Sequence, residues 1–222
     1  MAYLKAVLFD LDGTLVRTAP ISEIFLRILR KHNVHVSLKV REEFFPEVAE
    51  MDLKSFKLPY MEFWRVHNLR ILKKLGIQGD LERLADALTV EWWDNAELRV
   101  YPEVKDVLRS LRQMGLKIGI VSNGFQIDIH EILSRTGLES EFDVTVGVDD
   151  AGKPKPHPEI FEYALKKLKI KPHEALFVGD NPKTDYKGAE AAGLKPLLID
   201  RSGKIQGQYR KIRSLREIVN HV

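Results

Sequence analysis

The chain has 222 residues, no cysteine, and 35 lysines and arginines against 32 aspartates and glutamates. This length fits one large domain, or one domain with an insertion, and it buries enough surface to fold without disulfides or a structural metal. The absence of cysteine excludes a disulfide scaffold, an iron–sulfur site and a thiol nucleophile. No apolar run approaches about 18 residues, and no signal peptide is recognisable, so we expect a cytoplasmic protein without a membrane partner.

The net charge of +3 is too small to indicate a nucleic-acid partner. The basic excess lies in residues 195–222, which hold 7 basic and 2 acidic side chains. Within that segment we interpret Tyr209–Arg216 as solvated surface leading into a helix. Charged residues make up 30% of the chain, whereas asparagine and glutamine number only 11. Because this pattern is typical of thermophiles, we hypothesise a thermostable protein.

Five short apolar runs predict buried strands. They are Lys5–Phe9, Lys117–Ser122, Phe142–Val148, Ala175–Gly179 and Pro196–Ile199. Amphipathic stretches between the later strands predict the helices Pro102–Met114, Gln126–Arg135, Pro158–Leu168 and Thr184–Ala192. A capping box at Ser214–Glu217 predicts a last short helix. Strands that alternate with helices at this spacing predict an α/β fold, with a Rossmann-like parallel sheet flanked by helices.

Residues 16–98 break the alternation, since they contain helical patterns and no convincing strand. The predicted helices are Ile21–Lys31, Arg41–Glu50, Tyr60–Lys74 and Leu81–Asp94. We therefore expect a catalytic domain made of residues 1–15 and 99–222, with an all-helical domain, residues 16–98, inserted into it. The aromatic stripe Tyr60, Phe63, Trp64 and His67 has helical spacing and is interpreted as core.

Two carboxylates directly follow the first predicted strand, in the motif Asp10-Leu11-Asp12-Gly13-Thr14. The carboxyl end of a parallel strand is where open α/β sheets bind ligands. If their surroundings separate their pKa values, one aspartate can act as an ionised nucleophile and the other as a protonated acid. The alternative is an ordinary Asp-Gly turn in which Asp12 only ends the strand.

A second acidic motif, Gly179 to Asp185, follows the strand Ala175–Gly179. Together with Asp10, Asp180 offers the hard oxygen ligands that Mg²⁺ prefers. The alternative for Thr184 and Asp185 is a helix N-terminus, where such residues are favourable without any metal.

Two further motifs are suited to an anionic group. Ser122-Asn123-Gly124 supplies a hydroxyl, an amide and main-chain N–H groups before a helix, which fits a phosphate site but also an ordinary turn. Lys153 and Lys155 lie in a proline-rich segment that holds a cation before the next helix, where it could neutralise a phosphoryl group.

In this order, the four motifs resemble those of the haloacid dehalogenase superfamily, in its phosphatase branch, and the helical insertion resembles that superfamily's C1-type cap. The resemblance implies that Asp10 is the nucleophile that forms an aspartyl-phosphate, and that Asp12 is the acid and then the base. It implies that Lys155, with Lys153 as second choice, pairs with Asp10 and the phosphate. The residues it implies for phosphate binding are Thr14, Ser122, Asn123 and Lys155. Those it implies for Mg²⁺ are Asp10, Asp12 through its main-chain carbonyl, Asp180 and Asp185.

The resemblance implies a Mg²⁺-dependent phosphatase for a small phosphorylated metabolite. Asp12 favours a phosphatase over a dehalogenase, because a departing alkoxide needs a proton and a halide does not. A sugar phosphomutase and a non-catalytic phosphate-binding protein remain alternatives. The substrates considered are phosphoglycolate, sugar phosphates, glyceraldehyde 3-phosphate and nucleotides, and the oligomeric state is left open between monomer and homodimer.

Overall fold

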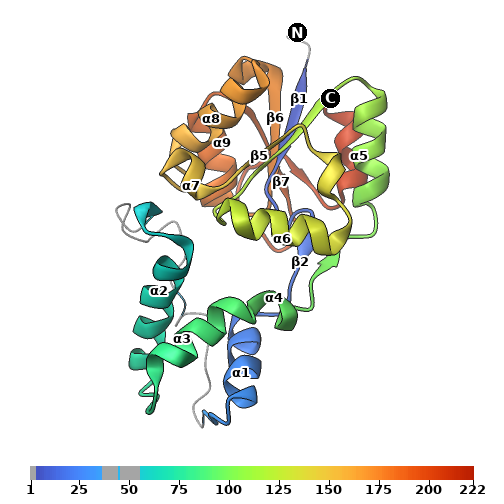
Figure 1. Ribbon diagram of the computed structural model, residues 1–222. Coiled ribbons are helices and arrows are strands. Elements are labelled where there is room, and N and C mark those ends of the chain that lie inside the picture. The colour runs from blue at the N-terminus through green and yellow to red at the C-terminus, as the bar shows by residue number, and fades with distance from the viewer. Residues whose placement is uncertain (1–3, 37–44, 46–55) are drawn as a thin grey trace. The chain divides into compact units, whose positions relative to one another are not determined.

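The computed structural model describes residues 4–36, residue 45 and residues 56–222 (Figure 1). The predicted helix Arg41–Glu50 lies almost wholly outside these residues. The chain divides into two compact units, one made of residues 1–17 and 99–222 and the other of residues 18–98.

The first unit is built on a six-stranded sheet with the order β5-β4-β1-β6-β7-β8, in which all neighbours are parallel. The strands are β1 (Ala6–Phe9), β4 (Lys117–Val121), β5 (Val144–Val146), β6 (Ala175–Gly179), β7 (Lys195–Ile199) and β8 (Lys211–Ile212). The predicted parallel α/β fold is confirmed. Strand β8 was not predicted, because two residues in a basic segment show no apolar run.

Helices cover both faces of this sheet (Figure 1). The α-helices of the unit are α5 (Val104–Gln113), α6 (Gln126–Thr136), α7 (Val148–Ala151), α8 (Pro158–Leu168) and α9 (Lys187–Ala191). The 3₁₀-helical turns are η4 (Glu139–Glu141), η5 (Pro172–Glu174) and η7 (Leu215–Asn220), and η6 (Pro182–Tyr186) is a π-helical turn. The turn η7 begins at the predicted cap, since the Ser214 side chain accepts a hydrogen bond from the N–H of Arg216.

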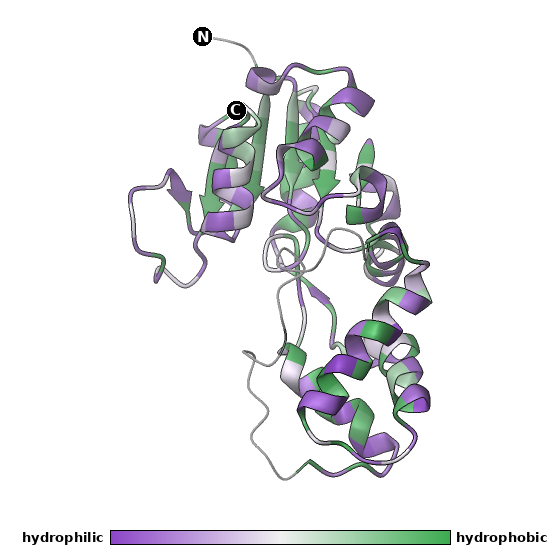
Figure 2. Cartoon of the chain, turned by 90° about the vertical axis from the view of Figure 1, so that its left-hand side faces the viewer, coloured by the Kyte–Doolittle hydropathy of each residue, from purple (hydrophilic) through white to green (hydrophobic). Residues whose placement is uncertain are grey.

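The sheet forms the centre of the hydrophobic core. All four residues of β1 are buried, as expected for a strand covered on both faces, and Figure 2 shows the strands as mostly hydrophobic. On one face, Leu8 and Phe177 belong to a cluster with residues of α8. The rings of Phe161 and Phe177 meet edge to face, with centroids 4.9 Å apart. The carboxyl ends of the central strands are thus held on a rigid layer.

The helix predicted at Thr184–Ala192 begins earlier and differently from expectation. A π-helical turn, η6, precedes α9. Asn181 caps that turn, because its Oδ1 accepts the N–H groups of Lys183 and Thr184 at 2.9 and 3.1 Å. The capping role considered for Thr184 and Asp185 is therefore taken by Asn181. A π-helical turn is common at functional sites.

The second unit consists, where described, of the helices α1 (Ile21–Lys31), α2 (Tyr60–Lys74), α3 (Leu81–Val90) and α4 (Trp92–Asn95). The predicted helix Leu81–Asp94 is broken at Glu91 into α3 and α4. Apolar side chains of α1, α2 and α3 form one core cluster. Of the helices in the described ranges, none has the length and apolar character needed to cross a membrane.

The aromatic stripe on α2 packs among aromatic rings. Phe63 is buried and stacks on Phe56 with ring centroids 5.4 Å apart. Trp64 lies edge-on to Phe63 and His67. Burial lowers the pKa of His67 to about 4, and the charge of Arg70 acts in the same direction.

Two short strands correct the expected limits of the insertion. β2 (Val16–Arg17) and β3 (Arg99–Val100) pair antiparallel. The expectation that residues 16–98 contain no strand is therefore wrong at Val16 and Arg17. Two-residue strands leave no periodic pattern in a sequence, which explains why the pair was not predicted.

Candidate active site

Three residues from separate sequence motifs directly follow three neighbouring strands. Asp10 follows β1, Ser122 follows β4 and Asp180 follows β6. Because β4, β1 and β6 are adjacent and parallel, these residues lie at one edge of the sheet, where open α/β sheets bind ligands.

A buried lysine joins two of the carboxylates. Nζ of Lys155 donates to Oδ1 of Asp10 at 2.5 Å and to Oδ1 of Asp185 at 2.7 Å, and Lys155 is only 2% exposed. Burial acts to lower the pKa of Lys155, but the two carboxylates outweigh it, so the pKa lies above its ordinary value. Lys153, the second choice, instead pairs with Glu159 and is partly exposed. The structure therefore brings Lys155, not Lys153, to the aspartates.

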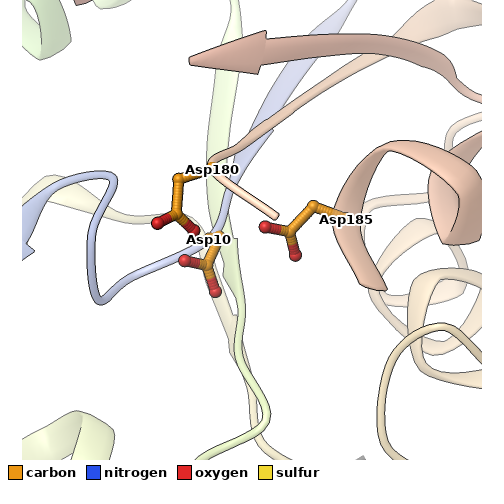
Figure 3. Close-up of side chains that lie close together, drawn as sticks. All are labelled: Asp10, Asp180 and Asp185. Atoms are coloured by element: carbon orange, nitrogen blue, oxygen red, sulfur yellow. The ribbon is translucent and has the colours of Figure 1, made fainter. Parts of the chain in front are cut away.

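The carboxylates of Asp10, Asp180 and Asp185 converge (Figure 3). Asp10, Asp180 and Asp185 each present an oxygen, and these oxygens all lie within 4.8 Å of one another. Burial raises the pKa of Asp10; Lys155 opposes this effect, while Asp185 and Asp180 add to it. Burial also raises the pKa of Asp180, and repulsion from Asp185 acts in the same direction. A cluster of this kind gains stability from a bound cation.

The carboxylates can approach so closely because glycines lie beside them. Gly13 has a φ of +77°, and a Cβ there would lie 2.3 Å from Oδ2 of Asp180. A Cβ on Gly179 would lie 2.4 Å from the carboxylate of Asp185. Both contacts are far shorter than a side chain tolerates, so these two positions require glycine.

The loop after β1 carries two side chains with different surroundings. Thr14 is fully buried, and its hydroxyl donates to Oδ2 of Asp10 at 3.3 Å. Asp12 is exposed, and its Oδ1 accepts the N–H of Gly13 at 3.1 Å. Desolvation by the surrounding protein raises the pKa of Asp12, and the Gly13 N–H opposes this.

The segment after β4 contacts the lysine segment directly. The N–H of Lys155 donates to Oδ1 of Asn123 at 2.6 Å, and Nδ2 of Asn123 donates to the carbonyl of Lys155 at 3.2 Å. Oγ of Ser122 accepts the N–H of Gly124 at 3.0 Å. The side chain of Asn123, expected to bind phosphate, is thus engaged with the main chain of Lys155.

Arg201, which lies two residues beyond the end of β7, was not predicted from the sequence. Its Nη2 donates to the carbonyl of Thr14 at 2.8 Å, and its Nη1 pairs with Oε1 of Glu103 at 2.7 Å. The signal that could have found it is the rule that identified Asp10, because Arg201 also follows a predicted strand closely.

The arrangement suits the transfer of an anionic group. Asp10 offers a carboxylate oxygen as nucleophile, Lys155 offers a fixed positive charge, and Asp12 offers an exposed carboxyl for proton transfer. Three clustered carboxylates fit a divalent cation with a preference for hard oxygen ligands.

Comparisons with known proteins agree with this chemistry. A family model described as haloacid dehalogenase-like hydrolase matches residues 4–193. The glyceraldehyde 3-phosphate phosphatase of Methanopyrus kandleri is 33% identical over 208 residues, which cover 91% of this chain and 86% of that protein. A HAD phosphatase structure from Thermococcus onnurineus is 29% identical with a TM-score of 0.70, covering 98% of this chain and 97% of that one. A 2-haloacid dehalogenase from Pseudomonas syringae is 27% identical with a TM-score of 0.72 and the same coverage.

Proposed function

The chain belongs to the haloacid dehalogenase-like hydrolases and is a phosphoric monoester hydrolase among them; from this we propose that it hydrolyses a small-molecule phosphate through a phosphoryl group carried on Asp10. The observation that carries this proposal is the contrast between two aspartates. Asp10 is buried against Lys155, whereas Asp12 is exposed on the same loop. The charge of Lys155 favours the ionised form of Asp10, the nucleophile, while desolvation raises the pKa of Asp12 and so favours its protonated form, the acid.

In the first step, a carboxylate oxygen of Asp10 attacks phosphorus, and the bond from phosphorus to the ester oxygen breaks. Protonated Asp12 gives its proton to the departing alkoxide. In the second step, ionised Asp12 takes a proton from water, which attacks the same phosphorus and releases inorganic phosphate and the carboxylate of Asp10. Before the attack, Lys155 favours the ionised form of Asp10 and orients its carboxylate, and its charge offsets that of the phosphoryl oxygens.

The residues present fit a magnesium ion. Asp10, Asp180 and Asp185 converge, and buried carboxylates that repel one another favour a cation among them. We propose that Asp10, Asp180 and the carbonyl of Asp12 hold Mg²⁺, with Asp185 supporting them. When bound, the ion neutralises negative charge on the phosphoryl group.

Asp12 also distinguishes this chain from a dehalogenase. Displacement of a halide leaves an anion that needs no proton, so an acid at this position has no task in that reaction. A phosphomutase of the same family would need the same acid and base. We propose hydrolysis rather than the phosphomutase reaction because two relatives that match 91% and 99% of this chain are named phosphatases.

For the substrate, we propose glyceraldehyde 3-phosphate as the first compound to test. Two relatives that cover 91% and 99% of this chain carry that activity in their names. We further propose that the helical unit, residues 18–98, is the cap that selects the substrate. We expect the protein to act in the cytoplasm, as a monomer or homodimer.

A phosphate-release screen tests the function. Purified protein is incubated with metabolite phosphates, including glyceraldehyde 3-phosphate, phosphoglycolate, sugar phosphates and nucleotides, with and without Mg²⁺. We expect release that requires both Mg²⁺ and Asp10, so that the Asp10→Asn variant releases none. Conversion of a hexose 1-phosphate to its 6-phosphate, dependent on the bisphosphate, would instead favour the mutase. The absence of release from every compound would contradict the proposal.

A further inference from the structure

Arg201 makes three contacts with the residues on either side of the strands β2 and β3. Its Nη2 donates to the carbonyl of Thr14 and its Nη1 pairs with Glu103, as given above. Its guanidinium lies over the ring of Tyr101, 3.5 Å from the ring centroid. Thr14 lies two residues before β2, and Tyr101 directly follows β3. One side chain thus holds both segments of the chain at the root of the inserted unit.

Thr14 connects Arg201 to the reacting groups. Its hydroxyl donates to Asp10, while its carbonyl is held by Arg201. The next residue, Leu15, accepts the N–H of Tyr101 at 3.1 Å. The loop that carries Asp12 is therefore tied at its far end by contacts to two other segments.

Glu103 is the counterion of Arg201. It is 7% exposed, and the same Oε1 that pairs with Arg201 lies within 3.5 Å of both the Ser214 hydroxyl and the Leu215 N–H. Burial acts to raise the pKa of Glu103, but the hydrogen bond and charge of Arg201 hold it below its ordinary value. A buried carboxylate with these partners fixes the guanidinium in one orientation.

The direction of the Asp12 side chain depends on the main chain of its loop. Its carboxylate is exposed and bonds to the N–H of its neighbour Gly13, so its direction follows the main chain of the loop. A displacement of about 1 Å costs a proton-transfer step on the order of 100-fold in rate.

We propose that Arg201 is a positioning residue for Asp12. Its planar fork fixes the main chain at Thr14, and thereby the direction in which Asp12 presents its proton to the leaving group. This inference rests on the function proposed above. The positioning role requires the planar guanidinium of arginine and not merely a positive charge, because a lysine offers a point charge without a second fixed donor.

The test compares esters that differ in their need for an acid. An aryl ester such as p-nitrophenyl phosphate loses a stabilised phenolate with little help, whereas an alkyl phosphate depends on a proton from Asp12. We measure kcat/KM, which covers the steps up to loss of the leaving group, for both esters. The variants are Arg201→Lys, Arg201→Gln and, as reference, Asp12→Asn.

We expect Arg201→Lys and Arg201→Gln to lower kcat/KM for the alkyl phosphate by roughly 10- to 100-fold, and for the aryl ester by several-fold less. Asp12→Asn should show the same selectivity more strongly. The matched control is Arg112→Gln, since Arg112 also joins a main-chain carbonyl, that of Glu141 at 2.8 Å, and a carboxylate, that of Asp143 at 3.7 Å. It should leave both values unchanged.

Each outcome decides between the hypotheses. An equal fall for both esters in Arg201→Lys, or no fall, overturns the positioning role, provided that Asp12→Asn still discriminates between them. If the unmodified protein hydrolyses neither ester, or Asp12→Asn affects both equally, the proposed function itself fails. Arg201→Lys retains the positive charge, and its unfolding midpoint shows whether it folds.

Discussion

The carboxamide of Asn123 pairs with both main-chain groups of Lys155, accepting its N–H at 2.6 Å and donating to its carbonyl at 3.2 Å. This two-way pairing fixes the segment after β4 to the segment that delivers Lys155. Asn123 therefore holds the main chain of the residue whose Nζ contacts both Asp10 and Asp185.

Replacing Asn123 by alanine should therefore lower kcat by roughly 10- to 100-fold, because Lys155 loses its fixed position. Steady-state kinetics with the best substrate of the screen provide the measurement. Asn68→Ala is the control, because Asn68 is buried and, like Asn123, donates to a main-chain carbonyl, that of Ala85. It should reduce stability while kcat remains. Full activity in Asn123→Ala would show that the pairing of Asn123 with Lys155 is not needed for catalysis.

Gly13→Ala should abolish Mg²⁺-dependent activity, because the new Cβ would collide with the carboxylate of Asp180. Gly115→Ala separates this collision from backbone strain. Gly115 has a φ of +78°, close to that of Gly13, and a Cβ added there would meet no atom within 4 Å. Both variants should lose about 1–2 kcal/mol of stability from the left-handed backbone, measured by denaturant unfolding. Equal activity in the two variants would contradict the close-approach argument.

The lowered pKa of Glu103 predicts that the free energy of unfolding depends on pH. Its folded-state pKa lies below the ordinary value of 4.5, so its pairing with Arg201 stabilises the fold above that pH and ceases to do so as the pH falls through the folded pKa. The difference in unfolding free energy between the unmodified protein and Glu103→Gln should be roughly 1–3 kcal/mol at neutral pH and should shrink in acid.

The control for this titration is Glu131→Gln. Glu131 pairs with Arg135 on the exposed surface of α6, and such pairs contribute little. Denaturant unfolding at a series of pH values should show a flat difference for Glu131→Gln. A flat difference for Glu103→Gln as well would remove the stabilising role of the ion pair.

Mg²⁺ should raise the unfolding midpoint, because a ligand that binds only the folded state stabilises it by an amount that grows with the logarithm of its concentration above Kd. The rise should disappear in Asp180→Asn, which removes one of the converging carboxylates. Asp106→Asn, at an exposed ion pair with Arg109, should retain it. A rise of the same size in Asp180→Asn would place the bound ion elsewhere.

Much of this site follows from local sequence. Asp10 and Asp180 were predicted because each directly follows an apolar run that forms a strand, and the parallel order of those strands brings them together. Lys155 was preferred over Lys153 by resemblance alone, and its contacts depend on residues distant in the chain. No local pattern shows that Asn123 pairs with Lys155.

The features that the sequence did not predict have different physical causes. β2, β3 and β8 are two-residue strands, too short for a periodic signal. Arg201 lies 187 residues from Thr14 in the chain, and its meaning appears only when the fold places the two together. The break between α3 and α4 at Glu91 has no proline or glycine near it that would have indicated it.

The proposed mechanism requires that Asp10 carries the phosphoryl group and that Asp12 activates the water that removes it. The most direct test incubates Asp12→Asn with p-nitrophenyl phosphate and Mg²⁺, followed by rapid acid quench and mass spectrometry of the peptide that contains Asp10. Because this variant can lose the phenolate but cannot activate water, we predict that the phosphoryl group accumulates on Asp10. A variant that turns over repeatedly with no phosphoryl group on Asp10, or that carries it on another residue, would contradict the account.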